Sequence, residues 1–227
     1  MSSRFARLPI FVPLLAGASL RDRLLACAGA VIGIGLTALL SAWLLKGGGY
    51  LPVLVAPIGA SAVLLFAVPS SPLAQPWSIV GGNMISALVG VAAARLVADP
   101  ALAAALAVAG AILAMSLCRC LHPPGGAAAL TAVIGGAAVA KAGWLFPFVP
   151  VAFNSALLVA AGWAFHRFSG HSYPHRPARA VAPLLHREDI DRALAEIGET
   201  FDIAREDLDD LLSRAEGHAL RRQGGRR

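Results

Sequence analysis

The chain has 227 residues, of which 57% are hydrophobic and 14% are charged, and its mean hydropathy is +0.69. This composition excludes an ordinary soluble domain and is typical of an integral membrane protein. The net charge of +6 does not indicate nucleic-acid binding, because the basic residues flank the apolar body and form no single patch. Eleven of the 13 acidic residues follow residue 187, which predicts a membrane body with a soluble tail.

Composition divides the chain into four segments. The tail has hydrophobic residues at helical spacing, which predicts helices at 187–197 and 205–216 and a frayed basic end at 221–227. Prolines interrupt the apolar amino-terminal stretch, which favours an interfacial segment over a cleaved signal peptide. The predicted segments are an interfacial amino-terminal segment (1–23), a transmembrane domain (24–166), a basic juxtamembrane linker (167–187) and an acidic helical tail (188–227).

Six apolar runs approach the length that an α-helix needs to cross a bilayer. The sequence therefore predicts an all-α fold, a polytopic transmembrane helical bundle with six spans. Four spans are the alternative, if the short second and fifth segments re-enter the membrane without crossing it. The six runs cover residues 24–45, 51–68, 79–98, 101–117, 124–140 and 144–165.

The basic residues predict the orientation. Lys and Arg gather before the first run and after the last one, while the internal loops have one at most. We therefore expect a multi-pass protein of the inner (plasma) membrane with both ends in the cytoplasm. The flanking residues are Arg4, Arg7, Arg21 and Arg23 at the amino end, and Arg167, Arg176, Arg179 and Arg187 after the last run.

Two of the six runs are broken by proline and glycine in a similar way. Aligning Pro57 with Pro123 also aligns Gly59 with Gly125, and the two breaks lie 66 residues apart. With six spans, the second and fifth segments run in opposite directions. Broken segments at matching positions of two halves are typical of an inverted repeat and point to its binding site.

The two breaks are candidate anion sites. Proline fits the first turn of a helix, and glycines without side chains let an anion approach the free N–H groups and the positive end of the helix dipole. The other interpretation, left open by the sequence, is that these small residues only pack helices closely. The candidate residues are Pro57, Gly59, Ala60, Ser61, Asn83, Arg119, His122, Gly125 and Gly126.

The other polar residues of the apolar body have simpler interpretations. Arg95, Lys141 and His166 lie at predicted span ends, where long or amphipathic side chains reach the interface. Asn154 lies deeper and is expected to form a hydrogen bond with a neighbouring helix.

Acidic residues are nearly absent from the apolar body, where Asp99 is the only one between residues 24 and 165. A cation or proton pathway lined by carboxylates is therefore not indicated, and an anion is favoured. The stretch from Cys118 to His122 offers at most three soft ligands around an arginine, so buried thiols are favoured over a metal site. We find no catalytic motif and predict no enzyme, no cofactor and no metal.

Four motifs in order resemble the HPP family of membrane proteins, over about residues 20–170. The motifs are Pro57-x-Gly59-Ala60-Ser61-Ala62-Val63-Leu64-Leu65-Phe66-Ala67, then Ser71-Pro72-Leu73-Ala74-Gln75-Pro76-Trp77, then Gly81-Gly82-Asn83, and Leu121-His122-Pro123-Pro124-Gly125-Gly126. The resemblance implies an integral membrane protein, usually described with four transmembrane helices.

The resemblance also implies a function. Plastid and cyanobacterial members have been linked to nitrite transport, so a small-anion transporter or channel is expected. The tail is similar to the connector that precedes a pair of CBS domains in longer members. The alternative function is a membrane anchor or sensor whose tail binds a cytoplasmic partner. The expected partners are membrane lipid and a small inorganic anion, with no nucleic acid; a homo-oligomer is left open.

Overall fold

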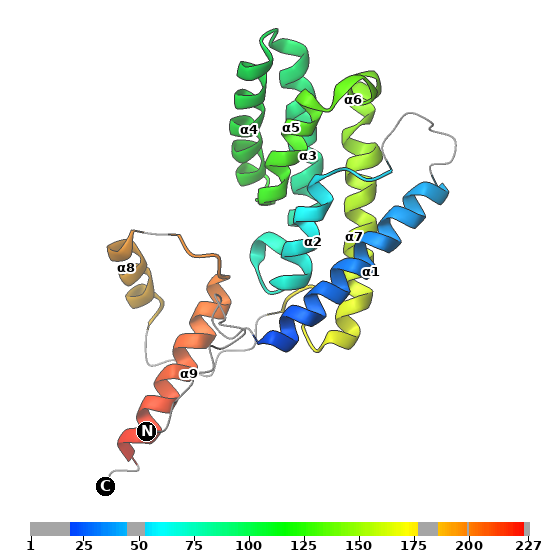
Figure 1. The fold of residues 1–227 in the computed structure, drawn as a ribbon. Helices are drawn as coiled ribbons and strands as arrows, with labels where there is room; N and C mark the ends of the chain where they lie inside the picture. Colours follow the sequence, from blue (N-terminus) through cyan, green and yellow to red (C-terminus); the bar gives the residue numbers. More distant parts are fainter. Residues whose placement is uncertain (1–18, 45–52, 177–185, 199, 225–227) are drawn as a thin grey trace, which may run out of the picture.

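The computed structural model describes residues 19–44, 53–176, 186–198 and 200–224, and in these ranges all regular elements are helical (Figure 1). The all-α prediction is thus confirmed. Most of the expected interfacial segment lies outside the described residues. The elements are α1 (Leu20–Leu44), α2 (Pro57–Ala67), η1 (Pro72–Ala74), α3 (Pro76–Leu96), α4 (Pro100–Leu117), α5 (Pro123–Ile134), α6 (Gly136–Ala142), η2 (Gly143–Leu145), η3 (Pro147–Ala152), α7 (Phe153–Ser169), α8 (Arg187–Ile197) and α9 (Arg205–Gly224).

Four helical stretches are long and apolar enough to cross a membrane: α1, α3, α4 and Pro147–Ser169, which combines η3 and α7 and has a kink at Val149 (φ −130°, ψ 112°). The fifth predicted segment is a bent pair, Pro123–Ile134 and Gly136–Leu145, with an angle of 94°. Counted as one span, the pair raises the number to five. Helix α2 has 11 residues, about 16 Å, against a hydrocarbon core of about 30 Å. By length and composition the described helices therefore give four or five spans, and α2 and the bent pair are the segments that distinguish the four-span from the six-span prediction.

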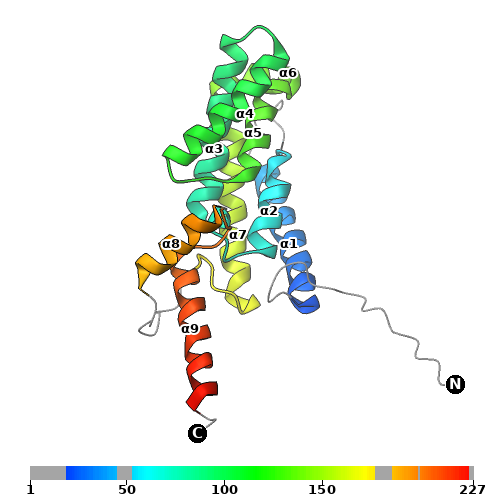
Figure 2. The ribbon, with the colours of Figure 1, turned by 90° about the vertical axis from the view of Figure 1, so that its left-hand side faces the viewer.

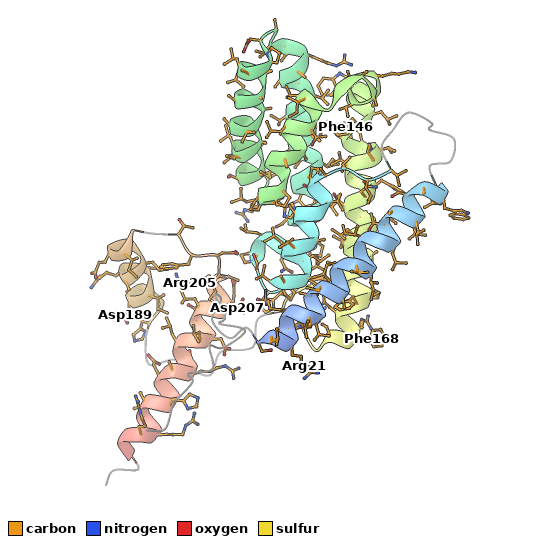
Figure 3. The ribbon with its side chains drawn as sticks, in the orientation of Figure 1. Arg21, Phe146, Phe168, Asp189, Arg205 and Asp207 are labelled. Carbon is orange, nitrogen blue, oxygen red and sulfur yellow. The ribbon has the colours of Figure 1, made fainter. Side chains whose placement is uncertain are left out.

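The helices of the membrane body run in alternating directions. Figure 3 shows Arg21, at the start of α1, and Phe168, near the end of α7, at one end of the bundle, with Phe146 toward the other. Helices α2 and α5 run in opposite directions (Figure 1). This arrangement is the one that an inverted repeat of two broken segments requires.

Glycines allow the helices to approach closely. A Cβ atom on Gly33 of α1 would lie 2.6 Å from the ring of Phe66, and one on Gly90 of α3 would lie 2.4 Å from the carbonyl oxygen of Ala129 in α5. Small residues at helix contacts are the usual means of packing in membranes. Helices α3 and α5 are therefore in backbone contact along much of their length.

Asn154 of α7 connects three segments of the chain. Its Nδ2 donates to Ser41 Oγ of α1 at 2.8 Å and to the carbonyl of Val53 at 3.1 Å, and its Oδ1 accepts from the N–H of Val55 at 3.2 Å. The expected hydrogen bond with a neighbouring helix is confirmed.

Replacing Asn154 with leucine leaves these three groups unpaired. We expect the variant to lose about 1–3 kcal/mol of stability, measured by thermal unfolding in detergent. Ser116→Ala is the control, because that exposed hydroxyl donates only to the carbonyl of Ile112 in its own helix. Equal melting temperatures for wild type and Asn154→Leu would contradict the role of Asn154.

His166 differs from its sequence interpretation. The side chain is buried and does not reach the interface: Nε2 lies 3.0 Å from the carbonyl oxygen of Leu65 in α2, and Nδ1 lies 2.8 Å from Ser169 Oγ. The partner is the carbonyl of Leu65 in the last turn of α2, and the sequence does not reveal it.

The acidic tail contacts the end of the bundle where α1 starts (Figure 2). Ser71 donates to the carboxylate of Asp202 at 2.8 Å, and His175 Nε2 lies 2.8 Å from Asp207. Tyr173 is buried and donates to the carbonyl of Ala74, and this burial raises the pKa of Tyr173.

Helix α9 continues to Gly224, so the expected fraying is wrong for residues 221–224.

Candidate functional site

The centre of the candidate site is His122, which is fully buried and precedes the first turn of α5. Its Nδ1 lies 2.8 Å from the carbonyl oxygen of Leu73, and its Nε2 lies 2.8 Å from Ser61 Oγ of α2. A carbonyl oxygen only accepts, so Nδ1 carries a hydrogen. The histidine thereby connects the start of α5 with α2 and with the loop before α3.

Ser61 makes three polar contacts with one hydroxyl hydrogen. Its Oγ accepts from Asn83 Nδ2 at 3.0 Å, and it also lies 3.1 Å from the carbonyl oxygen of Pro57. With neutral His122, the hydroxyl donates to Nε2; with protonated His122, Nε2 donates and the hydroxyl turns to Pro57. The network therefore accepts either protonation state of the ring without moving a heavy atom.

Asn83 of α3 extends the network to α7. Its Nδ2 also donates to Ser155 Oγ at 3.1 Å, and Ser155 donates to the carbonyl of Val151. The Oδ1 atom of Asn83 is buried and has no hydrogen-bond partner among the described residues, and the same is true of Ser86 Oγ. Because buried polar groups are costly unless paired, these two atoms are candidates for contact with a ligand.

Gly125 places the first turn of α5 against α3. A Cβ atom at this position would lie 2.6 Å from Ser86 Oγ, 2.7 Å from Met115 Sδ and 3.0 Å from the carbonyl oxygen of Gly82. A Cβ on Gly82 would lie 2.6 Å from the Cβ of His122. Positions 82 and 125 therefore have no room for a side chain. The unpartnered hydroxyl of Ser86 lies directly beside Gly125 at the start of α5.

Gly59 and Ala60, in the first turn of α2, lie apart from this cluster. Pro57 is the first residue of the helix, as expected, and it is buried. Gly59 and Ala60 are exposed, and a Cβ on Gly59 would meet nothing within 4 Å. Helix α5 contacts α2 through Ser61, one turn further on. The two helix starts therefore do not face each other directly.

Arg119 and Gly126 are also peripheral. Arg119 is exposed in the connection before α5 and has a φ of 54°, which is uncommon for a residue with a side chain. Gly126 is half-buried, and a Cβ there would only touch Val108 at 4.0 Å. Of the nine predicted residues, the structure brings together Pro57, Ser61, Asn83, His122 and Gly125.

Sequence reasoning missed Ser86, Ser155 and the Leu73 carbonyl. Ser86 follows Asn83 by three residues, which places both on one face of a helix. That spacing was the available signal. The role of the Leu73 carbonyl could not be predicted from the sequence, because every residue has a backbone carbonyl.

An all-helical bundle with four or five apolar spans and a buried polar network at a broken helix defines a polytopic α-helical membrane protein. Residues 16–174 match the family model described as HPP, transmembrane region. The chain belongs to the HPP family, as its motifs suggested.

Two curated transmembrane proteins of Dictyostelium discoideum are similar to the chain. One is 39% identical over 127 residues, which cover 54% of this chain and 44% of the relative. The other is 41% identical over 120 residues, 51% of this chain and 38% of the relative. The chain thus matches less than half the length of these relatives. No solved structure matches it.

Proposed function

We propose that the protein moves a small monovalent anion across its membrane, as a transporter or channel, with nitrite as the candidate suggested by the family. The observation that carries the proposal is the unpartnered buried hydroxyl of Ser86, which lies beside the start of α5; the unpartnered Oδ1 of Asn83 belongs to a residue three positions earlier in α3. The proposed membrane is the inner (plasma) membrane, with both ends of the chain in the cytoplasm.

The charges around this site favour an anion. The amino end of α5 is the positive end of a helix dipole. Pro123 and Pro124 have no N–H and the N–H of Gly125 donates to the carbonyl of His122 at 2.8 Å, so the dipole and not free N–H groups favours an anion here. Asp99, the only acidic residue between 24 and 165, accepts from the N–H of Leu102 at the start of α4. Ser86 can donate its hydroxyl hydrogen, and a half-turn of the Asn83 carboxamide exchanges its unpaired acceptor for a donor.

Entry of an anion requires movement. The close approach of Gly125 to Ser86 and Gly82 means that the first turn of α5 must separate from α3 before an ion fits between them. Movement of one repeat against the other around a fixed site is the usual mechanism of transporters with inverted repeats. The neighbouring His122 network is linked to α2 and α7, so it connects the site to the rest of the bundle.

The test is flux in proteoliposomes. Purified protein is reconstituted, and uptake of nitrite, nitrate, chloride and bromide is compared with uptake of potassium. We expect selective anion uptake above that of protein-free liposomes. Uptake of potassium alone, or no uptake of any ion, would contradict the proposal.

The second candidate is a membrane anchor or sensor. The observation that favours it is an apolar cavity of about 770 Å³ between α8 and α9, lined by residues that include Ile190, Leu194, Phe201 and Leu208. An open apolar surface on an acidic tail suits a protein partner.

Deletion of residues 188–227 distinguishes the two functions. A transporter is expected to keep its anion uptake without the tail, because none of the tail residues that the structure describes lies in the His122 network. An anchor or sensor is expected to lose the binding of its cytoplasmic partner in the cell. Loss of uptake in a deletion variant that remains folded would favour the second candidate.

A further inference from the structure

The bent pair leaves the bundle at the end opposite the start of α1 (Figure 1). Its residues line a cavity of about 350 Å³ together with residues of α3. Helix α5 ends at Ile134, and the chain turns by 94° into α6 through Gly136, which has a φ of 79°. The wall is formed by residues that include Val91, Arg95, Val133, Val139 and Gly143.

Among the residues that the structure describes, Arg95 is the only ionisable one that lines this cavity. It lies in the last turn of α3, and its Cζ lies 5.7 Å from the centre of the Trp144 ring. Gly143 has a φ of 52°, and a Cβ there would lie 2.5 Å from Nη2 of Arg95. The glycine thus lets the guanidinium lie against the backbone of the turn after α6.

The positive charge of Arg95 has no acidic partner in the described part of the chain. Asp99 is close in sequence, but its carboxylate accepts from the N–H of Leu102. The tendency of basic residues to gather at one side of a membrane does not account for Arg95 either, because the residues of the basic flanks, such as Arg21 and Arg167, lie at the other end. A long arginine side chain at a span end can reach the membrane interface, but this does not account for the cavity beside Arg95.

We propose that this cavity binds the headgroup of an anionic phospholipid, with the phosphate on Arg95. A guanidinium pairs with phosphate through two parallel hydrogen bonds. The apolar wall formed by Val91, Val133 and Val139 suits the adjoining hydrocarbon, and Trp144 is of the type that occupies the headgroup level. This site is separate from the His122 network and does not depend on the proposed transport.

The test uses full-length protein in detergent, titrated with short-chain phosphatidylglycerol, phosphatidylcholine or inorganic phosphate, and binding is followed by native mass spectrometry. We expect phosphatidylglycerol to bind at least about tenfold more tightly than phosphatidylcholine, and Arg95→Gln to remove that preference. Arg95→Lys keeps the charge but loses the paired geometry, so an intermediate affinity is expected.

Arg167→Gln is the matched control. Arg167 also stacks on a tryptophan, with its Cζ 4.2 Å from the centre of the Trp163 ring, but it lies at the other end of the bundle. Its replacement should leave the preference unchanged. Equal loss in both variants, equal binding of the two lipids, or equal binding of inorganic phosphate would overturn the proposal.

Discussion

Replacing Gly125 with leucine is expected to reduce anion uptake by proteoliposomes to the background level. The new side chain would enter space held by Ser86, Met115 and the carbonyl of Gly82, all within 3.0 Å of the position of its Cβ. Excess volume at such a contact costs about 1–3 kcal/mol or more and displaces the backbone. The leucine side chain would therefore occupy the space beside Ser86 that opens when the first turn of α5 separates from α3, and no ion could bind there.

Gly59→Leu is the matched control. It makes the same change at the corresponding position of α2, where a Cβ meets nothing within 4 Å. We expect normal uptake and a normal melting temperature. The site assignment would be contradicted if both variants, at equal amounts of folded protein, transported equally well.

Replacing His122 with leucine is expected to have the second large effect. Leucine cannot bond the carbonyl of Leu73 or the hydroxyl of Ser61, so two buried hydrogen bonds are lost. The expected loss of stability is about 1–3 kcal/mol, since the carbonyl of Leu73 is left unpaired, whereas the hydroxyl of Ser61 can still donate to the carbonyl of Pro57. Uptake should also fall to background, because Ser61 and Asn83 are no longer held by the ring.

His166→Leu separates the two effects of this change. His166 is also buried and also contacts one backbone carbonyl and one serine hydroxyl, those of Leu65 and Ser169. Its replacement should lower the melting temperature by a comparable amount, while uptake per folded molecule is retained. If both variants lose uptake in proportion to stability alone, His122 has only a structural role.

The starts of the short helices could be predicted from the sequence. Proline has no N–H to donate and fits only the first turn, so Pro57 and Pro123 mark the beginnings of α2 and α5, as observed. The break after Ile134 was missed, because Gly135 and Gly136 occur in an apolar run that reads as one span. Only the φ of 79° at Gly136 reveals the bend.

The centre of the candidate site was predictable only in part. Ser61, Asn83 and His122 stand out as polar residues in apolar surroundings, and the structure joins them by hydrogen bonds. The inclusion of Gly59 rested on its alignment with Gly125. That alignment could not show which face of α2 meets α5, because the face depends on packing between segments far apart in the chain.

The position of a bound anion tests the central claim most directly. Bromide is a small monovalent ion whose anomalous scattering locates it in crystals of the protein. If bromide is transported in the flux assay, we predict an anomalous peak in contact with Ser86 and the first turn of α5. Transport of bromide together with a bound ion found only elsewhere in the bundle would contradict the account.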